Sequence, residues 1–195
     1  MEILPIFPTN DQINQIDHHV FHEEFTDEEI MWVNNLSKLY QPEKAQIGGA
    51  DVETDIRNSE IHWLKYDDNT KWLYDRLAHL VMIGNREKWN FSLHSIADTI
   101  QYTKYYDNGN HYDWHLDLGF GPTNGRKVSI TVQLSDPEDY EGGDFQIMRG
   151  PKIETLPKTK GTVLLFPSYL LHRVTPVTKG VRKTLVLWVG GHPFI

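Results

Sequence analysis

The chain contains three side chains of types that commonly bind metals, at a spacing suited to one site. His115 and Asp117 stand two positions apart in a β-rich run, and residues two apart on a strand point to the same face. His172 lies on a later β-rich run, from which it could complete the set. Two imidazoles and one carboxylate form the facial triad of non-haem iron(II), which leaves positions open for a co-substrate and oxygen. Three protein ligands also suit a hydrolytic zinc site, so zinc is the rival metal.

An arginine downstream of this set favours the iron interpretation. The His-x-Asp pattern alone is weakly specific, because His111 and Asp113 repeat it four residues earlier. Arg182 follows His172 by ten residues, on the next β-rich run. A guanidinium can bind a carboxylate bidentately, so Arg182 could hold the far end of a dicarboxylate. A hydrolytic zinc site would not require such a group.

Short strands must carry these side chains. From Phe91 onward the chain consists of short β-rich runs separated by turn signals, which favours a barrel or jelly roll over alternating strands and helices. Asn108-Gly109 and Gly142-Gly143 are typical of hairpin turns. We expect strands at Ile100–Tyr106, His111–Asp117, Val128–Leu134, Asp144–Met148, Thr162–Phe166, Leu170–Val174 and Thr184–Val189.

One of these runs, Val128–Leu134, has two chemically different faces. Its apolar side chains alternate with Ser129, Thr131 and Gln133. Because successive side chains of a strand point to opposite faces, one face is apolar and the other presents hydroxyl groups and an amide. The polar face predicts a ligand cavity.

Two helices are predicted ahead of most of the strands. Thr26 and Glu29 form a capping-box pattern before an amphipathic run that ends ahead of Pro42. A second helical pattern, from Leu73 to Val81, is expected to lie against the sheet. The polar stretch 41–58 between them is predicted to be a mobile loop. A solvated approach to the first helix is expected for His18, His19 and His22.

Composition limits the class of protein. The 195 residues suffice for one domain with a substantial core, and the net charge of -8 disfavours duplex nucleic acid or an anionic membrane as a partner. No cysteine is present, so neither disulfides nor thiolate metal sites are expected. A reducing, cytoplasmic location is expected instead. The first Lys or Arg is Lys38, so no signal peptide is expected. No apolar run approaches the ~20 residues of a membrane helix.

Several short motifs occur in a fixed order along the chain. They are Tyr106-x-x-Gly109-x-x-Tyr112-x-x-His115-x-Asp117, then Gly142-Gly143-Asp144-Phe145, then His172 with Arg182. In this order they resemble the prolyl 4-hydroxylase branch of the iron(II)- and 2-oxoglutarate-dependent oxygenases, over roughly residues 100–189. Upstream, Ile56-Arg57-Asn58-Ser59 with Trp63-Leu64 is similar to the segment of that family that folds over the active site.

The resemblance implies a mainly β fold with flanking helices, built on a double-stranded β-helix of the jelly-roll, cupin-like kind. We expect one domain over residues 1–195, with 1–89 as helical support and mobile loop and 90–195 as the β-helix core. The implied cofactors are Fe(II), 2-oxoglutarate as co-substrate and O2, with ascorbate as an optional addition.

The resemblance also implies a role for individual residues. Arg182 would pair with the C5 carboxylate of 2-oxoglutarate, and Tyr106 would donate a hydrogen bond to the same molecule, beside Thr131 and Gln133. Gln133 stands where the family often has an aromatic residue, so Thr131 is expected to supply that contact. The implied iron ligands are His115, Asp117 and His172.

Three further positions bear on the substrate. Tyr112, Arg126 and Trp188 resemble residues that frame the target proline in hypoxia-sensing and bacterial elongation-factor prolyl hydroxylases. An aromatic pair can enclose a pyrrolidine ring, and an arginine can donate to a peptide carbonyl. The implied reaction is hydroxylation of a prolyl residue of a protein or peptide, with 2-oxoglutarate converted to succinate and CO2.

Other functions remain open from the sequence. The same iron chemistry would serve a hydroxylase of a free amino acid or small metabolite. A cupin-like module that binds an anion without turnover is a non-catalytic alternative. Nucleic-acid demethylases of this chemistry carry a further arginine six residues after the co-substrate arginine, where this chain has Trp188, and the negative net charge argues in the same direction.

Overall fold

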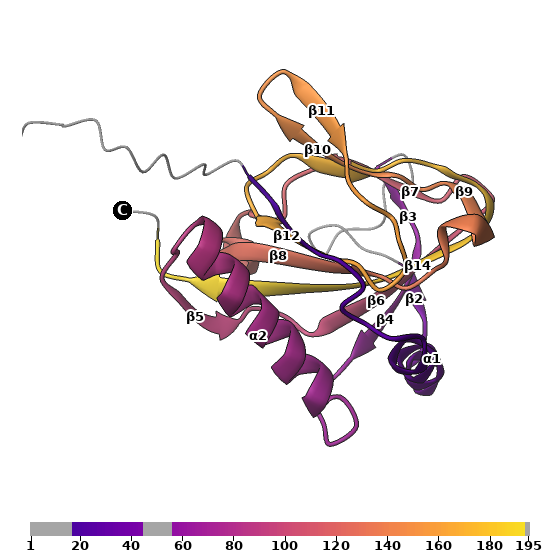
Figure 1. Ribbon diagram of the computed structural model, residues 1–195, viewed down its shortest axis with the longest axis horizontal. Coiled ribbons are helices and arrows are strands. Elements are labelled where there is room, and N and C mark those ends of the chain that lie inside the picture. Colours follow the sequence, from indigo (N-terminus) through magenta and orange to yellow (C-terminus); the bar gives the residue numbers. More distant parts are fainter. Residues whose placement is uncertain (1–16, 45–55, 194–195) are drawn as a thin grey trace, which may run out of the picture.

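The computed structural model describes residues 17–44 and 56–193, and its core is two antiparallel β-sheets that face each other (Figure 1). The strands of the larger sheet are β1 (His19–Phe21), β2 (Glu43–Lys44), β4 (Glu60–Leu64), β5 (Leu93–Ile96), β6 (Ile100–Tyr106), β8 (Arg126–Gln133), β9 (Tyr140–Gly142), β12 (Val163–Pro167) and β14 (Val177–Gly191). Those of the smaller sheet are β3 (Arg57–Asn58), β7 (His111–His115), β10 (Phe145–Arg149), β11 (Lys152–Thr155) and β13 (His172–Val174).

The two sheets form a jelly roll, which confirms the predicted mainly β fold. The larger sheet runs in the order β1-β12-β8-β14-β6-β4-β2, with β5 and β9 also paired to β14. The smaller sheet runs β11-β10-β13-β7-β3. Strands that follow one another in the sequence therefore tend to lie in different sheets, and the chain passes repeatedly across the space between them.

Both predicted helices are present, as α1 (Asp27–Leu36) and α2 (Lys71–Lys88). The capping box is formed: the Glu29 N–H donates to the Thr26 hydroxyl (3.3 Å), and the Thr26 N–H donates to the Glu29 carboxylate (2.8 Å). The helices lie on one side of the molecule, against the larger sheet, while β10 and β11 lie on the other side (Figure 1). Short 3-10 helices are η1 (Ser37–Leu39), η2 (Gly121–Thr123) and η3 (Pro137–Asp139).

Strand alternation divides the apolar side chains into two cores. On β12, Val163 and Leu165 join the core beneath the helices, whereas Leu164 and Phe166 join the core between the sheets. On β8, the apolar side chains all face the helices, which leaves the polar set to face the smaller sheet, as predicted. The larger sheet is thus braced on its outer face, and its inner face is free to build a cavity.

The two glycine-containing turns are not hairpins. The Asn108-Gly109 turn connects β6 of the larger sheet with β7 of the smaller one, and Gly142-Gly143 lies where the chain leaves β9 for β10. Gly109, Gly142 and Gly143 all have positive φ, so the turn chemistry was identified correctly. The predicted pairing of the flanking strands was wrong, because turn residues set the local reversal and not the sheet in which the next strand pairs.

The region ahead of residue 90 contributes more strands than expected. His19 pairs with Leu165 as part of β1, so the predicted solvated approach to the first helix was wrong there. The ends of the predicted loop 41–58 are the short strands β2 and β3, while 45–55 lies outside the described residues. These strands are only two or three residues long, too short for a periodic signal. The division at residue 90 stays a prediction.

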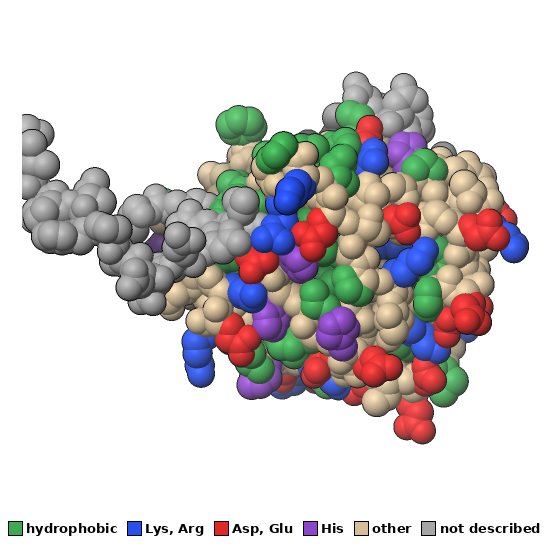
Figure 2. All heavy atoms as spheres, turned by 45° about the horizontal axis from the view of Figure 1, so that its top comes forward, with side chains coloured by type: hydrophobic (Ala, Val, Ile, Leu, Met, Phe, Trp, Pro, Cys, Tyr) green, Lys and Arg blue, Asp and Glu red, His purple; other side chains and the backbone are tan. Residues whose placement is uncertain are grey.

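The surface carries charges of both signs. On the face shown in Figure 2, acidic and basic side chains are interspersed rather than gathered into one patch of a single sign. Among the described helices, none combines the length and hydrophobicity that crossing a membrane requires.

Candidate functional site

Two neighbouring strands of the smaller sheet bring the predicted metal ligands together. His115 is the last residue of β7 and His172 is the first of β13, and the two are paired across the ladder. The predicted strand His111–Asp117 ends two residues early, and the backbone N–H of Asp117 donates instead to the carbonyl of Ser168 (3.0 Å). One ligand atom from each of His115, Asp117 and His172 lies within 4.8 Å of the others.

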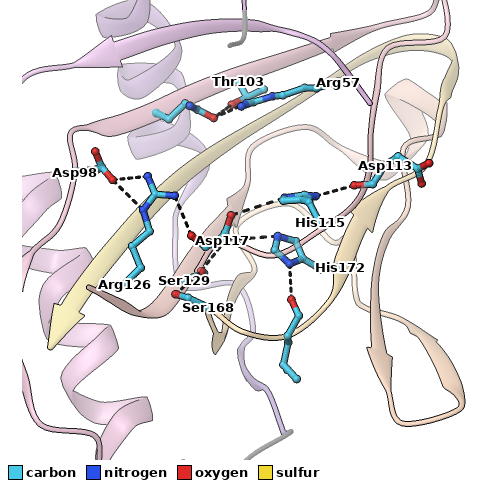
Figure 3. A network of polar contacts seen from close by, with 12 residues as sticks. Arg57, Asp98, Thr103, Asp113, His115, Asp117, Arg126, Ser129, Ser168 and His172 are labelled. Atoms are coloured by element: carbon cyan, nitrogen blue, oxygen red, sulfur yellow. Dashed lines mark hydrogen bonds and ion pairs between the residues drawn. The ribbon is translucent and has the colours of Figure 1, made fainter. Parts of the chain in front are cut away.

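Each imidazole is held so that one nitrogen stays free. Nδ1–H of His115 donates to the Asp113 carbonyl (2.7 Å), and Nδ1–H of His172 donates to the Leu170 carbonyl (2.8 Å). The Nε2 atoms lie 3.7 Å and 3.5 Å from the carboxylate oxygens of Asp117, as Figure 3 shows. A backbone acceptor on Nδ1 fixes the tautomer in which Nε2 is a metal ligand.

The electrostatics keep His115 and Asp117 in the form that a metal needs. Burial, reinforced by the charge of His172, lowers the pKa of His115 to about 3, so its ring is neutral near pH 7. Burial acts to raise the pKa of Asp117, but His172, His115 and the Ser129 hydroxyl together hold that pKa below its usual value. A neutral His115 ring beside an ionised Asp117 carboxylate is the protonation state that binding of a divalent cation requires of these two groups.

The polar face of β8 supports the carboxylate. The Ser129 hydroxyl donates to Asp117 Oδ2 (2.7 Å) and is itself 3.0 Å from the Ser168 hydroxyl. Both serines are fully buried. The side chain of Asp117 is therefore oriented by β8 of the opposite sheet, although Asp117 itself follows β7.

Arg182 is a buried cation on β14 without a carboxylate partner among residues 17–44 and 56–193. Its side chain is 1% exposed, its Nη2 donates to Gln133 Oε1 (3.2 Å), and its guanidinium lies 5.3 Å from the Tyr105 ring centre. Within the described chain, Arg182 Nε and Gln133 Nε2 are buried and have no hydrogen-bond partner. Both are donors, so this corner of the site lacks an acceptor, and a carboxylate would supply one.

Gly143 explains the glycine pair of the sequence motif. It has φ +59°, and a Cβ atom there would lie 2.9 Å from Cδ of Arg182. The backbone can therefore pass directly over the arginine side chain only if this position is glycine.

A cavity of about 480 Å³ between the sheets joins these groups. The three candidate metal ligands line it together with Arg182 and Thr131. Thr131 is buried on the same face of β8 as Ser129, so the predicted neighbourhood of Thr131 and Gln133 beside Arg182 is present. Leu116 (49% exposed) and Phe120 (99% exposed) also line the cavity and mark where it opens to solvent.

Tyr106 does not face this cavity. Its hydroxyl donates to Glu60 Oε2 (3.1 Å) on the opposite side of β6, so its predicted hydrogen bond to the co-substrate is a wrong assignment. Tyr105, one residue earlier, lines the cavity and lies beside Arg182. Two adjacent tyrosines on a strand point to opposite faces, and the motif spacing alone did not distinguish them.

Two predicted substrate residues are aromatic rings in the cavity wall. Tyr112 stacks on His115, with ring centres 3.4 Å apart and planes at 11°. Trp188 is buried at 6% exposure, and the guanidinium of Arg126 lies 4.0 Å from its ring centre. Both rings line the cavity.

Arg126 has a different set of partners from the predicted one. Its Nε donates to Asp98 Oδ2 (3.0 Å), its Nη2 pairs with the same carboxylate, and its Nη1 donates to the Asp117 carbonyl (3.3 Å). These contacts hold Arg126 against the Asp117 backbone and the Trp188 ring, and its expected role as donor to a peptide carbonyl stays a prediction. Asp98 lies outside every motif, so the sequence offered no signal for this ion pair.

Comparisons with known proteins agree with this geometry. Residues 100–190 match the family model described as 2OG-Fe(II) oxygenase superfamily. A PKHD-type hydroxylase of Synechococcus sp. (strain CC9902) is 43% identical over 83 residues, which is 42% of this chain and 36% of that protein. A PKHD-type hydroxylase of Prochlorococcus marinus (strain NATL2A) is 33% identical over 126 residues, 63% of this chain and 56% of its own length. The chain thus aligns with about a third to a half of each of these relatives.

A solved structure gives the same fold. A prolyl hydroxylase from Trichoplax adhaerens, in complex with a peptide fragment of the hypoxia inducible factor oxygen degradation domain, superposes with a TM-score of 0.77 at 20% identity. The superposition covers 93% of this chain and 86% of the other. Residues 100–190 are thus similar to 2OG-Fe(II) oxygenases, and the chain shares the fold of this prolyl hydroxylase.

The match to this superfamily implies Fe(II), 2-oxoglutarate and O2, and the side chains that line the cavity fit them. Two imidazoles and a carboxylate suit Fe(II), and the unpaired donors around Arg182 suit the far carboxylate of a dicarboxylate. Ascorbate stays a prediction, because none of the contacts described bears on it.

Proposed function

We propose that this protein is an iron(II)- and 2-oxoglutarate-dependent dioxygenase that hydroxylates an unactivated C–H bond. The target that we propose is a prolyl residue in a protein or peptide. The net reaction converts the C–H group, 2-oxoglutarate and O2 into the alcohol, succinate and CO2. One observation carries the proposal: a His-Asp-His set faces a buried arginine that has no carboxylate partner within the described chain, across one cavity.

In this proposal His115, Asp117 and His172 hold the iron, which supplies the oxidising chemistry when it is bound. The backbone carbonyls behind the two imidazoles and the Ser129 hydroxyl behind the carboxylate orient the three ligands. Since the supports of His172 and Asp117 are buried, these two ligands are preorganised before a metal arrives.

Arg182 and Gln133 are proposed to bind the C5 carboxylate of 2-oxoglutarate. Nε of Arg182 and Nε2 of Gln133 are two of the buried donors left without a partner in the described structure, and Thr131 adds a hydroxyl on the same strand face. A bidentate contact from Arg182 would fix the direction in which the co-substrate extends from the metal. Tyr105, beside the guanidinium, closes this corner of the cavity.

The prolyl assignment is supported by two aromatic walls and by the relatives. Tyr112 and Trp188 both line the cavity that contains the metal ligands, and such rings can pack on a pyrrolidine ring. The structural neighbour from Trichoplax adhaerens is named as a prolyl hydroxylase with a bound peptide. Arg126 is proposed to keep the Trp188 ring in place rather than to contact the substrate.

An extended substrate suits the cavity better than a small metabolite. The ring of Phe120 is 99% exposed and Leu116 is 49% exposed where the cavity opens. Exposed apolar side chains at the rim of a site offer contact area to a chain that extends beyond the cavity. This observation favours a protein or peptide over a free amino acid.

The first experiment does not depend on knowing the substrate. Metal-free protein is mixed anaerobically with Fe(II) and 2-oxoglutarate, and the visible spectrum is recorded for wild type and for His172→Ala. A metal-to-ligand charge-transfer band in wild type that is lost in the variant would support chelation at the proposed triad. Absence of the band in wild type, together with tight zinc binding, would favour the hydrolytic or binding-module alternatives.

The substrate class is tested separately, by oxygen-dependent succinate formation and by mass analysis of the products. We expect a gain of one oxygen atom on proline-containing peptides and little turnover of free proline. Turnover of free amino acids alone would instead favour the small-molecule alternative.

A further inference from the structure

A second buried arginine, Arg57 on β3, lies in the same cavity and has no role in the function proposed above. Its side chain is 6% exposed. Nε donates to the Ser59 hydroxyl (3.2 Å), and Nη2 donates to Gln101 Oε1 (2.7 Å). Both acceptors are neutral. Among the described residues, no carboxylate forms an ion pair with Arg57.

Arg57 is connected to the candidate metal site by one aromatic ring, that of Tyr112. Its guanidinium lies 4.5 Å from the centre of the Tyr112 ring, and the other face of that ring stacks on His115. Figure 3 shows Arg57 across the cavity from the group formed by His115, Asp117 and His172. Its charge also contributes to the lowered pKa of His115.

The neighbours of Arg57 hold it rigidly and do not neutralise it. Gln101 Oε1 also accepts a hydrogen bond from the Thr103 hydroxyl (3.1 Å), so the amide is fixed in the orientation that faces the arginine. The two hydrogen bonds use two of the five N–H groups of the guanidinium. A buried charge is normally paired with an opposite charge, and stacking on an aromatic ring compensates it only in part.

A count of charges singles out Arg57. Among the described residues that line the cavity are Arg57, Arg126 and Arg182 but only one carboxylate, that of Asp117. Arg126 is paired with Asp98. In the proposed function, the two carboxylates of 2-oxoglutarate are taken by the metal and by Arg182, and Asp117 is a ligand of the metal. Within residues 17–44 and 56–193, one positive charge, that of Arg57, then remains without an ion-pair partner.

We propose that Arg57 binds a carboxylate of the substrate and makes this oxygenase selective for a target that carries an acidic group close to the hydroxylated carbon. This inference rests on the proposed function. The carboxylate can be the side chain of a residue that flanks the target in a peptide, or the α-carboxylate of a free amino acid. Planar, bidentate recognition by a preoriented guanidinium is the chemistry common to both.

The test compares matched pairs of probes that differ only in charge. One pair is a blocked pentapeptide with a central proline and glutamate on both sides, and its counterpart with glutamine on both sides. The other pair is free L-proline and L-prolinamide. Dissociation constants are measured by anaerobic calorimetry on protein loaded with Fe(II) and 2-oxoglutarate, for wild type, Arg57→Gln, Arg57→Lys and Arg173→Gln.

Arg173 is a close chemical match for Arg57 outside the cavity. Its Nε donates to Gln146 Oε1 (2.8 Å), and its guanidinium lies 4.6 Å from the Trp114 ring centre. The Arg173→Gln variant therefore removes the same kind of stacked, amide-bound guanidinium and should leave substrate binding unchanged.

We expect wild type to bind the acidic member of one pair about tenfold more tightly than its amide, and Arg57→Gln to lose that preference. Arg57→Lys should retain part of it, because a lysine keeps the charge and loses the planar fork. Which pair shows the preference distinguishes the peptide from the free amino acid. Equal binding within both pairs by wild type, or an unchanged preference in Arg57→Gln, would overturn the assignment.

The charge-transfer band separates this inference from the function on which it rests. It is recorded for every variant before the probes are added. A wild-type band without any preference for carboxylates would overturn the role of Arg57 alone, whereas a missing wild-type band would overturn both proposals. A normal band in Arg57→Gln would show that the variant has kept its fold and its metal site.

Discussion

Among its single residues, the site contains buried polar groups that lack some of their hydrogen-bond or charge partners within the described part of the chain. The side chain of Arg182 is as buried as the apolar core, yet the one hydrogen bond that it makes within the described part of the chain is to a neutral amide. Burying an ion costs several kcal/mol unless an opposite charge accompanies it. A carboxylate ligand would therefore be bound more strongly here than at an exposed arginine, where water screens the pair.

Replacing Arg182 with alanine should weaken 2-oxoglutarate binding and spare iron. Hydrogen bonds to charged groups contribute about 1.5–3 kcal/mol, so we expect the affinity for 2-oxoglutarate to fall about 10- to 100-fold. Titration of 2-oxoglutarate against the charge-transfer band measures this change, and Fe(II) affinity measured alone is the control. If the variant keeps wild-type affinity for the keto acid, the guanidinium assignment is incorrect.

Ser129 should matter for the metal although it is not a proposed ligand. It donates to Asp117 Oδ2 from the opposite sheet, and loss of such a supporting hydrogen bond costs about 10- to 100-fold in metal affinity. We expect that loss for Ser129→Ala in a competition titration of Fe(II). Ser37→Ala is the matched control, because Ser37 is equally buried and donates to the Asn34 carbonyl on the helical side. Equal losses in both variants would argue for a general effect on folding.

At the scale of elements, the metal ligands and the arginine come from strands that are neighbours only in three dimensions. β7 and β13 pair and place the two histidines side by side. Arg182 lies on β14, which is a strand of the opposite, larger sheet. The connection from β9 to β10 passes over that arginine at Gly143. The position of the guanidinium thus depends on how closely this connection can approach.

Gly143→Ala should disturb the co-substrate site from outside it. The residue has φ +59°, a conformation that costs alanine about 1–2 kcal/mol, and the added methyl group would meet Arg182 and Val177 at 2.9 Å. We expect a melting temperature lower by about 2–8 °C and a weaker affinity for 2-oxoglutarate. Gly125→Ala is the control, because nothing lies within 4 Å of a Cβ atom there. A shift of equal size in both variants would contradict this interpretation.

At the scale of the whole molecule, helices brace the outer face of one sheet and the cavity opens on its inner face. This arrangement buries titratable side chains in their neutral state, His115 above all. Burial also lowers the pKa of His18 and His19. Protonation of these rings is therefore less favourable in the folded protein than in the unfolded chain.

The metal-free protein should lose stability when the pH falls from 7 to 5. The unfolded chain protonates His115 near pH 6.5, whereas the folded protein keeps it neutral down to about 3, so the unfolded state takes up the extra proton in this window. Stability then falls by up to about 1.4 kcal/mol per pH unit for this group. Urea unfolding at several pH values measures the slope. Asp117 does not contribute there, because its pKa lies below 3.8 in the fold.

His115→Gln should flatten that pH dependence, and His18 and His19 should leave a residual slope of the same sign. A variant with the full wild-type slope between pH 7 and 5 would show that the ring of His115 does not stay neutral in the fold.

Properties that depend on side-chain type and local periodicity could be predicted from the amino-acid sequence alone. Alternation along 128–134 separated a core face from a polar face, and the capping box located the start of α1. The ordered motifs identified the candidate metal ligands and Arg182 before any contact was known. These inferences hold because strand and helix periods are properties of the backbone itself.

Contacts between segments that are far apart in the chain became known from the three-dimensional structure and not from the sequence. It placed Tyr105 rather than Tyr106 in the cavity, paired Arg126 with Asp98, and brought Arg57 to the far side of the Tyr112 ring. None of these relations has a signature in local spacing, because each joins strands or loops far apart in the chain. The turn at Gly109 makes the same point: its backbone conformation is local, but the sheet that the next strand joins is set by packing across the whole molecule.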